Sequence, residues 1–278
     1  MMEFTLSDRR RGARWYDPAA GRWWGVDAMA EAYYSISPFA YVANNPVIFI
    51  DPNGEEIWIS ISGGSRVQYR DGQLWTNYGK QEKYEAEKGS FAAQSLAALN
   101  HILEDGGTIG AILINRLSLS KGDENWLGNV EILENTTSSN RGRAFSSGTD
   151  GMITWDPNSG VIVNEQGGMI SPSLVLAHEL GHIFNKFSNP EEHDRRLADN
   201  KNSGLFNNEE ERYNIGLWEK YIGKSFREKG YGEAVRNHHK GVYFETEGVK
   251  SNKPLIRTKT ANESFQDAIK KIKSLLNK

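Results

Sequence analysis

The stretch SLVLAHELGHIF, residues 173–184, places two histidines four residues apart inside an apolar run, in a chain that has only 6 histidines among 278 residues. On a helix, positions i and i+4 project from the same face, so His178 and His182 can present two nitrogens to one metal ion. Glu179 lies about 100° around the helix from His178, beside the metal rather than on it. The pattern H-E-x-x-H therefore predicts a zinc site with Glu179 as general base.

The flanking residues predict where this helix begins and ends. Ser171 is a favourable N-cap and Pro172 suits the first helical position, whereas Ser188, Asn189 and Pro190 mark the end. Gly181 costs about 1 kcal/mol of helix propensity relative to alanine, which is tolerated where another segment must approach closely. The alternative reading is a buried helix whose two histidines hydrogen-bond to neighbouring carbonyls.

The composition limits the possible function classes. The chain is 38% hydrophobic and 11% aromatic, which is enough for a packed core, and its formal charge of -3 argues against a nucleic-acid or anionic-membrane binder. Apolar runs stay below the roughly 18 residues of a membrane span, and the N-terminus lacks the apolar region of a classical signal peptide. Because the chain has no cysteine, a metal site must use His, Asp and Glu.

Periodicity predicts an α+β domain. Helical stripes cover residues 90–104, which Gly106 and Gly107 should end, and residues 262–276. Strand patterns cover residues 57–61, 66–69, 111–119 and 130–133. Two further strands, 152–155 and 161–164, flank the turn signal DPNSG and predict a hairpin. Together with the H-E-x-x-H helix, this order predicts a zincin-like metalloprotease domain with a mixed sheet and an active-site helix.

A catalytic zinc needs a third protein ligand and an open position. The metzincin extension would need Gly and His where Asn185 and Ser188 stand, so that class is excluded. His193 follows in NPEEHDRR, which we expect to be a loop. The nearby carboxylates are more typical of a solvated charged face: Glu191, Glu192, Asp194 and Asp199.

The stronger source of a third ligand is an acidic run in residues 207–221. A helix there could bring a carboxylate from the opposite side of the cleft. Spacing alone does not choose among Glu209, Glu210 and Glu211, since carboxylates also favour the first turn of a helix for electrostatic reasons. His238 and His239 lie further along the chain and could approach the site or lie at the surface, which we expect of both.

The N-terminal region is rich in aromatic and turn residues. It contains G-A-R-W-Y-D-P-x-x-G-R-W, then S-P-F-A-Y-x-x-N-N-P-V, then I-D-P-N-G. These motifs, in this order over residues 12–54, resemble the end of the core of Rhs/YD-repeat proteins. In that family this junction precedes a variable C-terminal toxin, so the resemblance implies a short β/turn-rich Rhs core remnant at residues 1–54 and a toxin domain at residues 55–278.

The same resemblance implies how the protein is delivered, where it acts and which partners it has. Toxins of this architecture are exported by dedicated secretion machinery without a signal peptide and act inside a target cell. The implied partners are a target protein, a cognate immunity protein in the producer, and the Rhs shell with its secretion machinery. The net charge and the length of the apolar runs, rather than the resemblance, lead us to expect no nucleic-acid partner and no membrane span.

A second resemblance concerns the site itself. S-P-S-L-V-L-A-H-E-L-G-H followed by E-E-x-x-x-x-G is similar to type III effector zinc proteases and to clostridial neurotoxin light chains. It implies Glu211 as the third Zn²⁺ ligand, with Glu210 as its outer neighbour. It also implies that Arg227 and Tyr231 stabilise the oxyanion of the reaction.

These observations predict a zinc endopeptidase toxin. Zn²⁺ held by His178, His182 and Glu211 would activate a water molecule, Glu179 would take its proton, and the hydroxide would attack a peptide carbonyl. Two other readings remain open. The same site could hydrolyse a non-protein amide such as a cell-wall crosslink, or the chain could be a non-catalytic Rhs-associated module.

Overall fold

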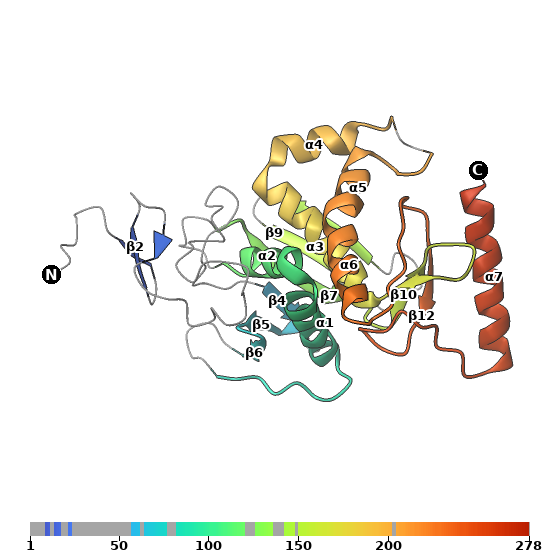
Figure 1. Cartoon of the computed structure of the whole chain (residues 1–278). Coiled ribbons are helices and arrows are strands. Elements are labelled where there is room, and N and C mark those ends of the chain that lie inside the picture. Colours follow the sequence, from blue (N-terminus) through green and yellow to red (C-terminus); the bar gives the residue numbers. More distant parts are fainter. Residues whose placement is uncertain are drawn as a thin grey trace. The chain divides into compact units, whose positions relative to one another are not determined.

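The computed structural model describes residues 57–61, 64–76, 82–119, 126–135, 142–147, 150–201 and 204–277, and three short strands nearer the N-terminus (Figure 1). The chain divides into two compact units, Met1–Gly54 with Asp123–Asn125, and Glu55–Gly122 with Trp126–Lys278. The first unit contains β1 (Arg9–Arg11), β2 (Arg14–Asp17) and β3 (Arg22–Trp23), which form an antiparallel sheet. Most residues that carry the Rhs resemblance lie outside the described residues.

A six-stranded mixed sheet forms the centre of the second unit. Its strands, in the order β6-β5-β4-β7-β9-β8, are β6 (Gln73–Trp75), β5 (Arg66–Arg70), β4 (Ile57–Ser60), β7 (Asn129–Glu134), β9 (Asp150–Trp155) and β8 (Gly142–Ser147). The β4/β7 and β7/β9 pairs are parallel and the others are antiparallel. The predicted α+β class and the strands at residues 57–61, 66–69 and 130–133 are confirmed.

Two helices join β6 to β7. The first, α1 (Phe91–Asp105), confirms the helix predicted for residues 90–104. The predicted strand at residues 111–119 is wrong, because this segment belongs to α2 (Gly107–Leu117). Its buried positions Gly110, Leu113, Ile114 and Leu117 have the i, i+3, i+4, i+7 spacing of a helix. Gly107, at φ +65°, redirects the chain into a second helix instead of ending helical structure.

The predicted hairpin around DPNSG is also wrong. β10 (Ser159–Ile162) pairs with β11 (Met169–Ile170) and β12 (Val242–Glu245) in a separate three-stranded sheet. The DPNSG segment is a turn between two sheets, in which Asp156 accepts hydrogen bonds from the Asn158 amide and the Ser159 hydroxyl. Turn residues therefore reverse the chain here without pairing the strands on either side.

The C-terminal helix α7 (Lys259–Leu276) packs on this smaller sheet, visible at the right of Figure 1. Its buried residues Phe265, Ala268 and Ile272 form a second hydrophobic cluster with Ile162 and Met169. The helix predicted for residues 262–276 is confirmed and begins three residues earlier, because Thr258 caps it by accepting a hydrogen bond from the Ala261 amide.

The H-E-x-x-H motif lies on α3 (Pro172–Ser188), whose ends are those predicted. The Ser171 hydroxyl accepts a hydrogen bond from the Leu174 amide, and Asn189 is the C-cap. Most of the helix is buried, and it contacts α1, β8, β9 and the helices that follow it. A buried helix cannot shift without disturbing the core around it, so α3 is a rigid support for the motif.

Four helical segments follow α3: α4 (Pro190–Ala198), α5 (Glu209–Asn214), the π-helical turn η4 (Ile215–Glu219) and α6 (Lys220–Glu228). The last three are continuous and confirm the predicted helix in residues 207–221. The loop predicted for NPEEHDRR is wrong, because Asn189 ends α3 and also caps α4, accepting a hydrogen bond from the Glu192 amide. The Asn-Pro pair thus ends one helix and begins the next.

Gly181 lies where α3 meets the α5–η4 helix. A Cβ atom at this position would lie 2.5 Å from Asn214 Oδ1 and 2.5 Å from Trp218 Cδ1, so only glycine permits this approach. Asn214 in turn donates a hydrogen bond to the His178 carbonyl oxygen. The propensity cost of Gly181 is therefore offset by the contact that brings the two helices together.

We predict that Gly181→Ala destabilises the fold by about 1–3 kcal/mol, because the added methyl group overpacks the helix contact and outweighs the gain in helix propensity. Chemical denaturation of both proteins measures the difference. Gly216→Ala on the adjoining η4 is the matched control, since no atom lies within 4 Å of its Cβ position and the site is exposed. Equal stability of the two variants would contradict this account of the contact.

Candidate active site

Three side-chain atoms form a nearly equilateral triangle at the centre of the site. Nε2 of His178 lies 3.2 Å from Nε2 of His182, and Oε2 of Glu211 lies 3.3 Å from each of them. A tetrahedral metal ion with bonds of about 2.0–2.1 Å has ligand atoms roughly 3.3–3.4 Å apart. The triangle therefore has the dimensions of one face of such a tetrahedron, with the fourth vertex left for another ligand.

The donor set also fits a cation chemically. Oε2 of Glu211 is buried and accepts no hydrogen bond from the described part of the chain, although three imidazole nitrogens lie within 3.3 Å of it. A buried carboxylate oxygen is costly unless positive charge compensates it, and protonated imidazoles or a bound cation can do so here. Two imidazoles and one carboxylate are ligands that zinc accepts.

His178 is oriented by a buried ion pair behind it. Its Nδ1 atom lies 3.3 Å from Oε2 of Glu219. Arg236 donates to both oxygens of that carboxylate, with Nε 2.8 Å from Oε1 and Nη2 2.6 Å from Oε2. Burial alone would raise the pKa of Glu219, but Arg236 and His178 outweigh it and hold that pKa at about 2. Glu219 is therefore an anion directed at Nδ1.

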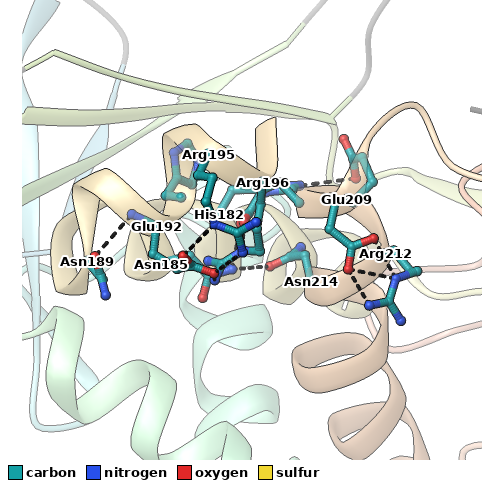
Figure 2. A network of polar contacts seen from close by, with 12 residues as sticks. His182, Asn185, Asn189, Glu192, Arg195, Arg196, Glu209, Arg212 and Asn214 are labelled. Atoms are coloured by element: carbon teal, nitrogen blue, oxygen red, sulfur yellow. Dashed lines mark hydrogen bonds and ion pairs between the residues drawn. The ribbon is translucent and has the colours of Figure 1, made fainter. Parts of the chain in front are cut away.

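His182 is supported in the same way from the other side. Its Nδ1 atom lies 3.5 Å from Oε1 of Glu210, which also accepts a hydrogen bond from the Asn185 side chain at 2.7 Å. Arg196 of α4 donates to the other oxygen of Glu210 at 2.6 Å. Figure 2 shows His182, Asn185, Arg196 and Asn214 in this network. Glu210 thus stands behind the His182 ring, on the side of Nδ1.

These two carboxylates set the protonation of the imidazoles. A carboxylate at Nδ1 favours the tautomer with the proton on that atom, which leaves the Nε2 lone pair free to bind a metal. His193 also lies near His182 and Glu210, with possible ligand atoms within 4.8 Å of one another. The guanidinium of Arg196 already neutralises Glu210, however, so this second cluster does not fit a cation.

The site attracts positive charge. Burial by itself lowers the pKa of each histidine, but the carboxylates outweigh it, so the pKa of His178 lies above its usual value and that of His182 rises to about 10. Burial raises the pKa of Glu211, yet the two imidazoles reverse this and lower it. Without a metal the site therefore holds protons, which a cation would displace.

Glu179 lies on α3 between the two histidines and is buried, with 7% of its surface exposed. Burial raises its pKa above the ordinary glutamate value. A glutamate with a raised pKa accepts and releases a proton nearer to neutral pH, which suits a general base and acid.

Arg227 and Tyr231 are not brought to the triangle. The Tyr231 hydroxyl donates to Asp105 at 3.0 Å, and its ring packs on His101 and Phe226. Arg227 lies in the last turn of α6, and its guanidinium group lies beside Gly223 of the same helix. Their proposed role in oxyanion stabilisation therefore gains no support from their contacts.

Four of the other carboxylates considered as ligands have partners elsewhere. Glu192 pairs with Arg195, Asp194 with Lys186, Asp199 with Lys201, and Glu209 with Arg212. His193 is buried, and its Nδ1 atom contacts Asp194 at 3.0 Å. Figure 2 shows the Glu209–Arg212 pair apart from His182.

His238 and His239 correct the expectation that both lie at the surface. His238 is buried, with 7% of its surface exposed. His239 Nε2 lies 3.2 Å from Glu211 Oε2, and its ring stacks on that of His178 with the centroids 5.8 Å apart. Burial lowers the pKa of His239 to about 4. The ring reaches the site because of the course that residues 231–241 take through the folded domain, which sequence spacing does not reveal.

The three atoms could therefore hold a metal ion, and comparison with known families supports a peptidase. The model of peptidase family M91, described as "Effector protein", matches residues 80–224, which are 145 of the 278 residues. Because the match covers more than half of the chain, the chain belongs to this family. Searches of curated proteins and of solved structures return no match. No helix among the described residues has the length and apolarity needed to cross a membrane.

A buried carboxylate also supports the beginning of α3. Oε2 of Glu233 accepts a hydrogen bond from the Ser171 amide at 2.8 Å, whereas its Oε1 is buried without a hydrogen-bond partner in the described part of the chain. Burial raises the pKa of Glu233 to about 7, from an ordinary value of 4.5. The folded protein therefore keeps this proton over a pH range in which the unfolded chain has lost it.

We predict that Glu233→Gln flattens the pH dependence of stability. As the pH rises from about 4.5 to 7, the unfolded chain releases this proton first, so the free energy of unfolding of the wild type falls by up to about 3 kcal/mol through this group. Denaturation at several pH values should show the variant losing less stability over this range. The exposed Glu263→Gln controls for charge, and parallel curves for all three proteins would contradict the prediction.

Proposed function

We propose that this member of peptidase family M91 is a zinc-dependent endopeptidase with His178, His182 and Glu211 as ligands. The observation that carries the proposal is the triangle of Nε2, Nε2 and Oε2 atoms with edges of 3.2–3.3 Å. Two neutral nitrogens and one carboxylate oxygen with a fourth position open are the ligand set of a catalytic zinc site. As part of the same proposal, the domain has a zincin-like fold.

A zinc ion bound there would supply a Lewis acid that lowers the pKa of water and polarises a peptide carbonyl. The chain itself supplies the proton transfers. Glu179 accepts a proton from the attacking water and returns it to the leaving amine nitrogen, so the carboxylate is regenerated in each cycle. Glu219 and Glu210 keep the Nδ1 protons in place and thereby hold both imidazoles in the binding tautomer.

We further propose that the peptidase is the toxin part of an Rhs-type protein, with residues 1–54 as the core remnant and residues 55–278 as the toxin domain. The motifs of residues 12–54 and the family description "Effector protein" support this proposal. A target-cell protein would be the substrate, and dedicated secretion machinery would deliver the chain. An immunity protein would protect the producer.

Glu179→Gln tests the peptidase directly. We expect the variant to bind one zinc ion as tightly as the wild type but to lose cleavage by at least about 100-fold, because the amide cannot take the proton. Wild type and variant are each incubated with cell lysate, and new peptide N-termini are identified by mass spectrometry. Termini produced only by the wild type would also name the substrate.

Identical termini in the two samples, from chains that each carry one zinc ion, would contradict the proposed peptidase for that proteome. Hydrolysis of cell-wall amide crosslinks by the wild type alone would then assign the same site to a different amide. The zinc content of both samples is measured first, so that loss of metal is not mistaken for loss of the base.

Glu211→Gln tests the third ligand. We expect its zinc affinity to fall at least about 100-fold, since one of three protein ligands loses its charge. Competition with a chromophoric chelator measures this affinity. Glu209→Gln is the matched control two residues earlier, because Glu209 pairs with Arg212. If Glu209→Gln or Glu210→Gln weakens zinc binding while Glu211→Gln does not, the ligand assignment is wrong.

A further inference from the structure

Residues 231–241 form an irregular segment that is fixed at several points near the site. The Ala234 amide donates to the Met169 carbonyl at 3.0 Å, and the His239 amide donates to the Leu205 carbonyl at 2.8 Å. Between them, Arg236 is bonded to both oxygens of Glu219. A segment held in this way presents its side chains in a defined orientation, as an ordered part of an active site must.

This segment places the His239 ring at the edge of the ligand triangle. Its Nε2 atom lies 3.2 Å from Oε2 of Glu211, and its ring is nearly parallel to that of His178, at 21°. The His239 side chain is 28% exposed, whereas those of His178 and Glu211 are 4% and 16% exposed. His239 is therefore more exposed to solvent than the three side chains of the triangle.

Asn207 determines which nitrogen of His239 carries the proton. The Nδ2 atom of Asn207 lies 2.9 Å from Nδ1 of His239. An amide nitrogen only donates, so Nδ1 is the acceptor and a neutral ring has its proton on Nε2. Glu211 Oε2 accepts no hydrogen bond from the described residues, so this N–H group is not used by the nearest carboxylate.

We infer that His239 is a further catalytic residue, whose Nε2–H group donates a hydrogen bond to the oxygen of the scissile carbonyl as negative charge develops on it. The inference rests on the proposed peptidase function. A preorganised donor at this position stabilises the transition state more than the ground state, because it strengthens as the oxygen gains charge. His239 would thus perform the role that sequence resemblance assigned to Arg227 and Tyr231.

The alternative is that His239 is a fourth metal ligand, which would need a lone pair on Nε2 and would close the site. The two roles differ in their effect on the metal. A donor leaves zinc affinity and the coordination sphere unchanged, whereas a ligand contributes to both.

Three variants separate these roles: His239→Ala removes the donor, His239→Gln restores a side-chain N–H, and Val235→Ala is an exposed control in the same segment. Four properties of each variant are to be compared with the wild type. They are zinc affinity, the visible spectrum after cobalt(II) substitution, the binding of acetohydroxamate to the zinc-loaded chain, and kcat and KM on the substrate found in lysate. The first three measurements do not depend on peptide hydrolysis.

For His239→Ala we expect zinc affinity within about threefold of the wild type and an unchanged cobalt spectrum. The kcat should fall by about 10²–10³ with KM little changed, and acetohydroxamate should bind about tenfold more weakly. His239→Gln should recover part of both losses, and Val235→Ala should behave as the wild type.

Two results would overturn the inference. Zinc affinity reduced more than tenfold with an altered cobalt spectrum would make His239 a ligand, and unchanged acetohydroxamate binding in His239→Ala would leave it without a donor role. If the wild type cleaves no peptide, the proposed function fails, yet the cobalt and acetohydroxamate measurements still decide the role of His239.

Discussion

The site depends on the charge balance behind its two imidazoles. Each Nδ1 faces a buried carboxylate, and each carboxylate is held by an arginine: Glu219 by Arg236, and Glu210 by Arg196. Removing one partner of such a buried pair typically costs about 3–5 kcal/mol, because the remaining charge is left uncompensated. The pairs therefore join α3 to the α5–η4 helix, to α4 and to residues 231–241. These contacts keep the Nε2 lone pairs of His178 and His182 free, and they also hold together the segments that surround the two rings.

The local features of this arrangement could be predicted from the sequence. The ends of α3 follow from Ser171, Pro172 and Asn189, and the shared face of His178 and His182 follows from helical geometry. The wrong predictions concern segments whose local sequence is compatible with two different structures. Residues 111–119 are apolar enough for a strand, but residues 111–117 lie in α2, which packs on α1. DPNSG reverses the chain whether or not the strands on either side of it pair.

The rest of the site could not be predicted, because it is assembled from contacts distant in the sequence. Glu219, Arg236 and His239 have no motif spacing, and their roles depend on which chain segments lie next to α3. The spacing could not choose among the three adjacent glutamates. The structure separates them by their partners: Glu210 and Glu211 contact His182 of α3, whereas Glu209 pairs with Arg212.

The π-helical turn η4 has a consequence for the spacing of acidic residues. Glu211 and Glu219 are eight residues apart, which in a regular α-helix would place them about 80° apart around the axis. The π-helical turn at Ile215–Glu219 accommodates one extra residue. Glu211 and Glu219 are therefore oriented like residues seven positions apart in a regular α-helix, which is about two turns. Both carboxylates contact His178 as a result. A chain that built the same site on an unbroken helix would need its glutamates at i and i+7. The π-helical turn thus allows two carboxylates eight residues apart in the chain to contact one imidazole ring.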